Sequence, residues 1–173
     1  ILLSVCCSMA TAQSKEKLAD QARSAIIRAV QFMHQKVAVH GGYVYQVSAD
    51  LKYREGEGVA ADETVWVQPP GTPAVGMALI EAYQRTGEKE ILNAARDAAH
   101  CLVQGQLHSG GWQAHIDFGG QLRTKLAYRV DGPLRKKARN ISSFDDDKTQ
   151  SAVRFLATYD AATKFADDKV HTA

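Results

Sequence analysis

The chain has 173 residues, of which 45% are hydrophobic and 23% are charged, and its formal net charge is +2. This length can hold one domain with a sizeable core, and the composition excludes an intrinsically disordered chain. The small net charge, without a long basic run interleaved with aromatic residues, argues against nucleic acid as a partner.

The first residues form a short apolar run that ends in small side chains. Residues 1–12 resemble the end of a secretory signal peptide, because a hydrophobic stretch precedes Ala10-Thr11-Ala12. The run is too short to span a bilayer. We therefore expect a secreted or periplasmic protein without a membrane span, whose domain comprises residues 13–173. Cys101 lies inside an apolar helical pattern, which predicts a buried structural thiol and no disulfide within the domain.

Apolar residues at helical spacing begin at Ser14 and continue to about Gly41-Gly42. Two short extended segments are predicted next, at residues 43–47 and 64–68. Thr72, followed by Pro73, has the character of an N-cap, and Gly87 is the expected end of that helix.

A further helix is expected from Glu88 to about Gly105, with alanine and leucine on its apolar face. An extended segment at residues 113–118 and a polar loop rich in lysine and arginine follow. The last predicted helix begins near Asp147.

The sequence contains an internal repeat. Gly41-Gly42-Tyr43 and Gly110-Gly111-Trp112 lie 69 residues apart, and each follows a predicted helix. The next helices also open alike, at Thr72 and at Thr149. Repeated helical hairpins that cannot bury their apolar faces alone predict a mainly α fold, an α/α barrel (toroid) with short β-strands in its loops. A closed toroid needs more hairpins than this chain supplies, so we expect the toroid to be incomplete.

The residues most suggestive of chemistry are three adjacent carboxylates, Asp145, Asp146 and Asp147. One aspartate would suffice to cap the following helix, whereas three repel one another and call for a compensating cation. Calcium, a basic partner, and capping with a solvated face all remain open. The spacing of the acidic residues does not fit a helix-loop-helix calcium loop. The chain has no pair of histidines at helical spacing, so a zinc site is not indicated.

Other candidate residues have a structural and a functional interpretation. Trp112 is either a stacking platform for a sugar ring or a core residue, and Asp117 is either a second acidic ligand or a turn residue at the end of a strand. The basic loop before the acidic cluster contains Lys125 and Arg129, and is either a solvated surface or a receptor for an anionic polymer.

These motifs resemble the family 10 polysaccharide lyases, which are pectate lyases built on an α/α toroid. Gly110-Gly111-Trp112 with Ile116-Asp117 is similar to the family's Gly-Gly-Trp-Pro-Lys-Asn-Ile-Asp. Residues 144–149 align with its Ile-Asp-Asn-Gly-Ala-Thr segment, and Arg154-Phe155-Leu156 with its Arg-Phe-Leu helix. The resemblance covers roughly residues 70–165, with order and spacing preserved.

The resemblance implies calcium-assisted β-elimination in polygalacturonate, an anionic polysaccharide, by a monomeric enzyme. It implies Ca²⁺ ligands at Asp145, Asp146 and Asp117, and substrate contacts at Trp112 and Thr149. The basic loop is particular to this branch and adds Lys125 and Arg129 as candidate contacts with the anionic polymer. The family's proton-abstracting arginine lies further towards the C-terminus, so no catalytic residue is assigned here.

The chain also departs from the family pattern. Asp146 and Asp147 stand where the family has Asn-Gly, and residues 113–115 replace Pro-Lys-Asn. Two alternatives therefore stay open: a non-catalytic α/α toroid that binds carbohydrate or protein, and another uronate-active or glycoside-active enzyme on the same fold.

Overall fold

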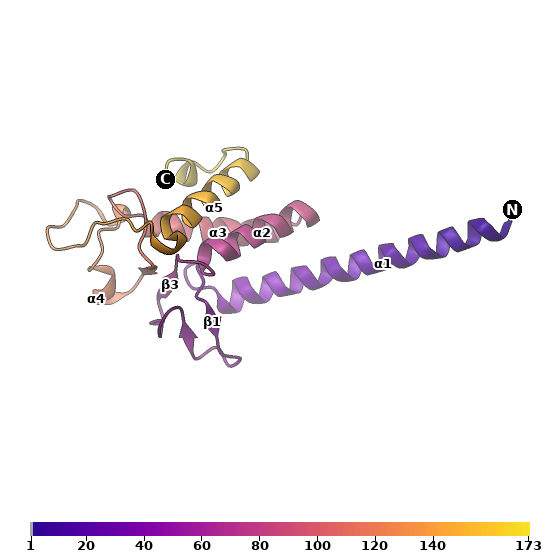
Figure 1. Ribbon diagram of the computed structural model, residues 1–173, viewed down its shortest axis with the longest axis horizontal. Helices are drawn as coiled ribbons and strands as arrows, with labels where there is room; N and C mark the ends of the chain where they lie inside the picture. Colours follow the sequence, from indigo (N-terminus) through magenta and orange to yellow (C-terminus); the bar gives the residue numbers. More distant parts are fainter. Residues whose placement is uncertain (1) are drawn as a thin grey trace.

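The computed structural model describes the backbone of residues 2–173 and the side chains of residues 15–173. The chain is mainly helical with a few short strands, as predicted, and the helices of the described residues do not close a barrel (Figure 1). In chain order the elements are α1 (Leu2–Phe32), a π-helical turn (Met33–Val37), β1 (Gln46–Val47), β2 (Arg54–Glu55), β3 (Thr64–Trp66), α2 (Thr72–Thr86), α3 (Lys89–Gly105), β4 (His115–Asp117), α4 (Gly120–Arg123), a 3₁₀ turn (Arg129–Asp131), a 3₁₀ turn (Asp145–Asp147), α5 (Lys148–Ala162) and α6 (Asp168–His171).

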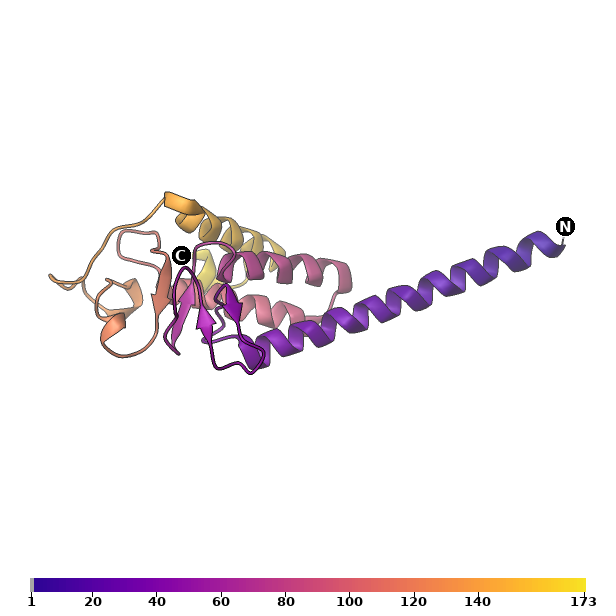
Figure 2. The ribbon, with the colours of Figure 1, turned by 60° about the horizontal axis from the view of Figure 1, so that its bottom comes forward.

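Helix α1 is long, and its N-terminal part projects away from the other helices (Figures 1 and 2). Only its last turns join the core, where Val30 is buried and Ile26 packs against it, while Leu18 is 65% exposed. The predicted leader remnant, residues 1–12, has helical backbone from Leu2, but its side chains lie outside the described residues. Among the helices described, none is both long enough and apolar enough to cross a membrane.

The core is formed by α2, α3 and α5, which pack side by side (Figures 1 and 2). Gly87 ends α2 in the left-handed conformation, as predicted, with φ of 70°. Helix α3 contributes mainly small side chains to this core, and Gly76 of α2 lies against the Phe155 ring of α5. These small residues let the three helices approach closely.

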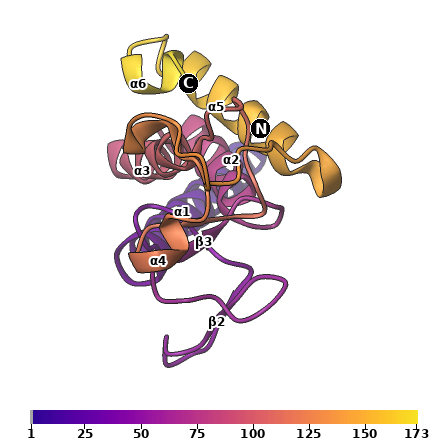
Figure 3. The same cartoon turned by 90° about the vertical axis from the view of Figure 1, so that its left-hand side faces the viewer.

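Two short antiparallel pairs of strands flank one end of the helices: β1 with β2, and β3 with β4. Figure 3 views this end, with α5 and α6 on one side of the molecule and β2 on the opposite side. The register of the second pair places Thr64 opposite Asp117 and Trp66 opposite His115. The extended segments predicted at 43–47 and 64–68 are therefore present but shorter.

The internal repeat is a repeat of structure. The backbone N–H of Tyr43 donates to the Thr72 hydroxyl at 2.9 Å, and that of Trp112 donates to the Thr149 hydroxyl at 3.1 Å. Both aromatic rings are 1% exposed. Gly41 and Gly110 take the same left-handed turn, with φ of 79° and 91°. Each Gly-Gly-aromatic loop is thus held by a threonine in the first turn of the next long helix, Thr72 of α2 or Thr149 of α5.

The prediction that Thr72 is the N-cap of α2 is wrong. Gly71 takes the N-cap position, and Thr72 is the first helical residue. The Thr72 side chain is fully buried and forms hydrogen bonds to the backbone of Tyr43, which lies in a loop that is distant in sequence. A hydroxyl used for that contact is not available to cap its own helix.

Thr149→Val is expected to lower the free energy of unfolding by about 1–3 kcal/mol, because the buried N–H of Trp112 would lose its acceptor. Urea-induced unfolding measures the change. Thr149→Ser keeps the hydroxyl and should retain most of the stability, and Thr72→Val should cost a similar amount in the first repeat. Equal stability of the valine and serine variants would contradict this role.

Candidate functional site

The acidic segment before α5 has an unusual backbone. Asp146 and Asp147 both adopt the left-handed conformation, with φ of 48° and 59°. Asparagine and glycine adopt this conformation most readily, and aspartate tolerates it better than most residues. Asp146 and Asp147 stand where the family that the sequence resembles has Asn-Gly, and aspartate, although a different residue type, also tolerates this turn.

The three aspartates do not cap α5 through their side chains, although Asp147 occupies the N-cap position. Two cations of the chain itself offset part of their charge. The Lys148 ammonium lies 3.5 Å from Asp146 Oδ2 and 3.7 Å from Asp145 Oδ2, and Arg154 lies 3.1 Å from Asp147. Asp145 and Asp146 nevertheless expose 81% and 56% of their side chains. The pair therefore presents carboxylate oxygens to solvent.

Next to Asp146 lies a group of polar side chains from the segment between α1 and α2, of which Gln68 and Trp66 are buried, Tyr45 is half-buried and Glu57 is exposed. The Gln68 amide Nε2 donates to Glu57 at 2.7 Å and lies 3.5 Å from Asp146 Oδ2. Among the described residues, Gln68 Oε1, the Tyr45 hydroxyl and Trp66 Nε1 have no hydrogen-bond partner although they are buried. Unpaired buried polar atoms are costly, and they commonly mark places completed by a ligand or water.

The electrostatics of Tyr45 place it in this group. Burial, followed by the negative charges of Glu57 and Asp146, raises the pKa of the Tyr45 phenol above its ordinary value. The phenol therefore stays protonated at neutral pH and can donate a hydrogen bond. We name Tyr45, Glu57, Gln68, Asp145, Asp146 and Lys148 together the acidic site.

The donor atoms of the acidic site suit calcium in kind, because carboxylate and amide oxygens are its usual ligands. Their number is small. In the part of the chain with described side chains, no group of three or more His, Cys, Asp or Glu residues is placed to hold a metal ion. A calcium ion at Asp145 and Asp146 would have to draw its remaining ligands from water and from carboxylates of a bound substrate.

Asp117, the third predicted calcium ligand, does not join the acidic site. Its side chain is buried, with Oδ1 accepting from the Thr64 hydroxyl at 2.6 Å and Oδ2 lying 3.3 Å from His115 Nε2. Thr64, the partner of Asp117, precedes Gln68, the neighbour of Asp146, by four residues, which corresponds to roughly 13 Å of extended chain. Asp117 instead joins β3 to β4.

Trp112, predicted as a possible stacking platform, is a core residue. Its ring is 1% exposed, and its Nε1 donates to the Leu102 carbonyl at 2.8 Å. The aromatic ring exposed beside the carboxylate pair is that of Phe144, which is 67% exposed. Phe144 lies within the motif that carries the family resemblance, but sequence reasoning did not single it out as a substrate contact.

The remaining predicted substrate contacts are dispersed. The Thr149 hydroxyl is occupied by the Trp112 backbone, and the exposed Lys125 is close enough to Asp117 for its charge to lower the pKa of that carboxyl. Arg129 donates to the Thr172 carbonyl at 3.4 Å and lines a cavity with His100 and Lys169. Among the described residues, no side-chain hydrogen bond or ion pair joins Thr149, Lys125 or Arg129 to Asp145 or Asp146.

Sequence reasoning missed Tyr45, Glu57 and Gln68. Tyr45 and Gln68 lie in the extended segments predicted at residues 43–47 and 64–68, and Glu57 lies in the loop of mixed charge between them. No spacing links these three residues to Asp146. One signal was present: Gln68 stands directly before Pro69-Pro70-Gly71, where the chain turns into α2. Neither a protein-family model, nor a curated protein, nor a solved structure matches this chain. Function is therefore inferred from the residues themselves.

Proposed function

We propose that the chain forms part of an α/α toroid, a secreted or periplasmic pectate lyase-like protein that acts on polygalacturonate by calcium-assisted β-elimination. The observation that carries the proposal is the acidic site: two exposed carboxylates beside buried polar atoms that lack protein partners. The threonine-held Gly-Gly-aromatic repeat supports the toroid, because each hairpin docks its loop on the next helix in the same way.

The chemistry of the substrate fits this arrangement. Each galacturonate carries a carboxylate that Asp145 and Asp146 would repel, so a cation is needed between them. Calcium, when bound, supplies that charge neutralisation and favours removal of the sugar's C5 proton. Phe144 offers an apolar ring on which a sugar face can pack. The base that removes the proton is not assigned to a residue of this chain.

The reaction is tested by incubating the full-length protein with polygalacturonate, with and without a calcium chelator, and following the ultraviolet absorbance of the unsaturated product. We expect a calcium-dependent rise. Asp145→Asn combined with Asp146→Asn should reduce the rate by about a hundredfold, within the range for lost electrostatic stabilisation. Asp147→Asn is the matched control from the same segment, because Asp147 pairs with Arg154.

A second function has one observation in its favour. The Lys148 ammonium lies near both carboxylates and competes with calcium for them. This arrangement favours a non-catalytic toroid that binds carbohydrate or protein. Calcium-independent binding of polygalacturonate without formation of unsaturated product would support it, and the absence of both binding and elimination would refute the uronate proposal altogether.

A further inference from the structure

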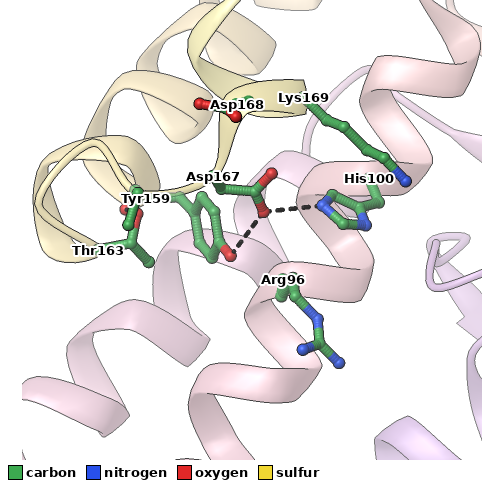
Figure 4. Close-up of a pocket in the computed structure, with 8 residues that line it drawn as sticks. Arg96, His100, Tyr159, Thr163, Asp167, Asp168 and Lys169 are labelled. Atoms are coloured by element: carbon green, nitrogen blue, oxygen red, sulfur yellow. Dashed lines mark hydrogen bonds and ion pairs between the residues drawn. The ribbon is translucent and has the colours of Figure 1, made fainter.

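A second polar cluster joins three helical elements on another part of the molecule (Figure 4). Asp167, directly before α6, accepts a hydrogen bond from His100 Nε2 of α3 at 2.8 Å and from the Tyr159 hydroxyl of α5 at 3.1 Å. The Asp167 side chain is 15% exposed. The histidine ring is therefore fixed in orientation, with its Nδ1 edge turned away from Asp167.

The charge state of the cluster follows from its contacts. Burial alone would raise the pKa of Asp167, but hydrogen bonds and charge from His100, with the Tyr159 hydroxyl, bring it below its ordinary value. Burial and the charge of Asp167 raise the pKa of Tyr159. Asp167 is thus ionised at neutral pH, and its charge is used within the protein by these two donors.

Two cavities meet at this cluster. One has a volume of about 420 Å³ and is lined in part by Arg96, His100 and Lys169. The other has a volume of about 400 Å³ and is lined in part by His100, Arg129 and Lys169. Because His100 and Lys169 border both, the two cavities are adjacent, and we name them together the α3–α6 groove.

The α3–α6 groove is bordered by positively charged side chains that make few or long contacts within the protein. Among the described residues, no carboxylate lies within salt-bridge distance of the Lys169 ammonium. The Arg129 guanidinium makes one long bond of 3.4 Å to a backbone carbonyl. Arg96 has one exposed contact of 3.5 Å to its neighbour Asp97. These cations are available to an anion.

The cations are also distributed along the groove and not gathered at one point. Arg96 and His100 lie four residues apart on α3, about 6 Å along the helix axis, and Arg129 lines the far cavity. In Figure 4 Lys169 extends towards His100, while Asp168 points away from it. A row of cations suits an extended ligand with repeated negative groups better than a single small anion.

We propose that the α3–α6 groove, through Arg96, Lys169 and Arg129, is a second binding site for acidic oligosaccharides, in which the carboxylates of successive uronate residues contact successive cations. The ligand class rests on the proposed function, whereas the site itself shares no residue with the acidic site. The groove holds the polymer on the protein without taking part in elimination. His100 borders both cavities.

The test is titration calorimetry of the full protein with oligogalacturonate in the background Asp145→Asn, Asp146→Asn. Lys169→Gln combined with Arg129→Gln should weaken the remaining affinity on the order of tenfold, because charge-assisted hydrogen bonds are lost. Lys52→Gln combined with Lys89→Gln removes the same charge from exposed positions outside both cavities and should change little. Thermal melting confirms that each variant is folded.

Each result decides between separate claims. Equal affinity of the groove variant and the control would overturn the groove, even if calcium-dependent elimination is observed. Loss of affinity in the groove variant without any elimination by the unmutated protein would support the groove and refute the proposed function. Displacement of the oligosaccharide by inorganic phosphate at equal concentration would overturn the uronate assignment and leave a general anion site.

Discussion

Trp112→Ala is expected to lower the free energy of unfolding by about 3–5 kcal/mol, the range for removing a large aromatic ring from a packed core. The ring is 1% exposed and packs where the loop after α3 meets α5. The substitution also removes the Nε1 bond to the Leu102 carbonyl, leaving a buried acceptor without that donor. Guanidinium-induced unfolding followed by circular dichroism measures the change.

Trp112→Phe is the control, because it keeps most of the buried ring and loses the indole N–H. It should cost about 1–3 kcal/mol and leave oligogalacturonate affinity unchanged. If Trp112 were instead a platform for a sugar ring, both Trp112→Ala and Trp112→Phe would keep full stability and lose affinity for oligogalacturonate. That outcome would contradict the burial of the ring. Phe144→Ala is the corresponding change at the exposed ring and should leave stability nearly unchanged.

The repeat was the part of the fold that the sequence predicted best. Gly-Gly before an aromatic residue is visible at both loops, and Thr72 and Thr149 are visible at both helix starts. The hydrogen bonds that join the loops to these threonines were not predicted. A hydroxyl that bonds to a loop 29 or 37 residues away leaves no local pattern in the sequence. Local capping was the simplest reading of Thr72, and tertiary contact overrode it.

The candidate site was predicted less completely for a similar reason. Asp145 and Asp146 are neighbours in sequence, so their proximity was certain, whereas the position of Asp117 depended on the register of β3 with β4. That register places it opposite Thr64, away from Gln68. Arg129 was expected to face a polymer bound at the aspartates, and the fold of its loop directs it to the α3–α6 groove instead.

Asp117→Asn and Asp146→Asn form a matched pair that separates structural from ligand-binding carboxylates. Asp117→Asn is expected to lower the free energy of unfolding by about 1–3 kcal/mol, because a buried carboxylate bonded to Thr64 and paired with His115 loses its charge. Asp146→Asn should change stability by less than about 0.5 kcal/mol, since the position is exposed and asparagine suits its left-handed backbone.

Binding should show the opposite order. We expect calcium-dependent affinity for oligogalacturonate to fall by roughly tenfold or more in Asp146→Asn, one lost ligand charge being comparable to a lost charge-assisted bond. Asp117→Asn should retain it under conditions in which the variant is folded. A comparable loss of affinity in both variants would show that Asp117 also belongs to the binding site.

The pH dependence of stability gives an independent signature of Asp117. Burial would raise the pKa of this carboxyl, but hydrogen bonds from His115 and Thr64 and nearby positive charge bring it below the ordinary value of 3.8. Because the folded-state pKa is lowered, the ionised carboxylate contributes its full stabilisation above the ordinary pKa value. This stabilisation is lost as the pH falls through the folded-state pKa. The difference in stability between the unmutated chain and Asp117→Asn should therefore be largest at neutral pH and shrink below about pH 4. Urea titrations at neutral pH and at pH 3 measure it, and a difference that grows on acidification would show that the carboxylate of Asp117 is destabilised by its burial.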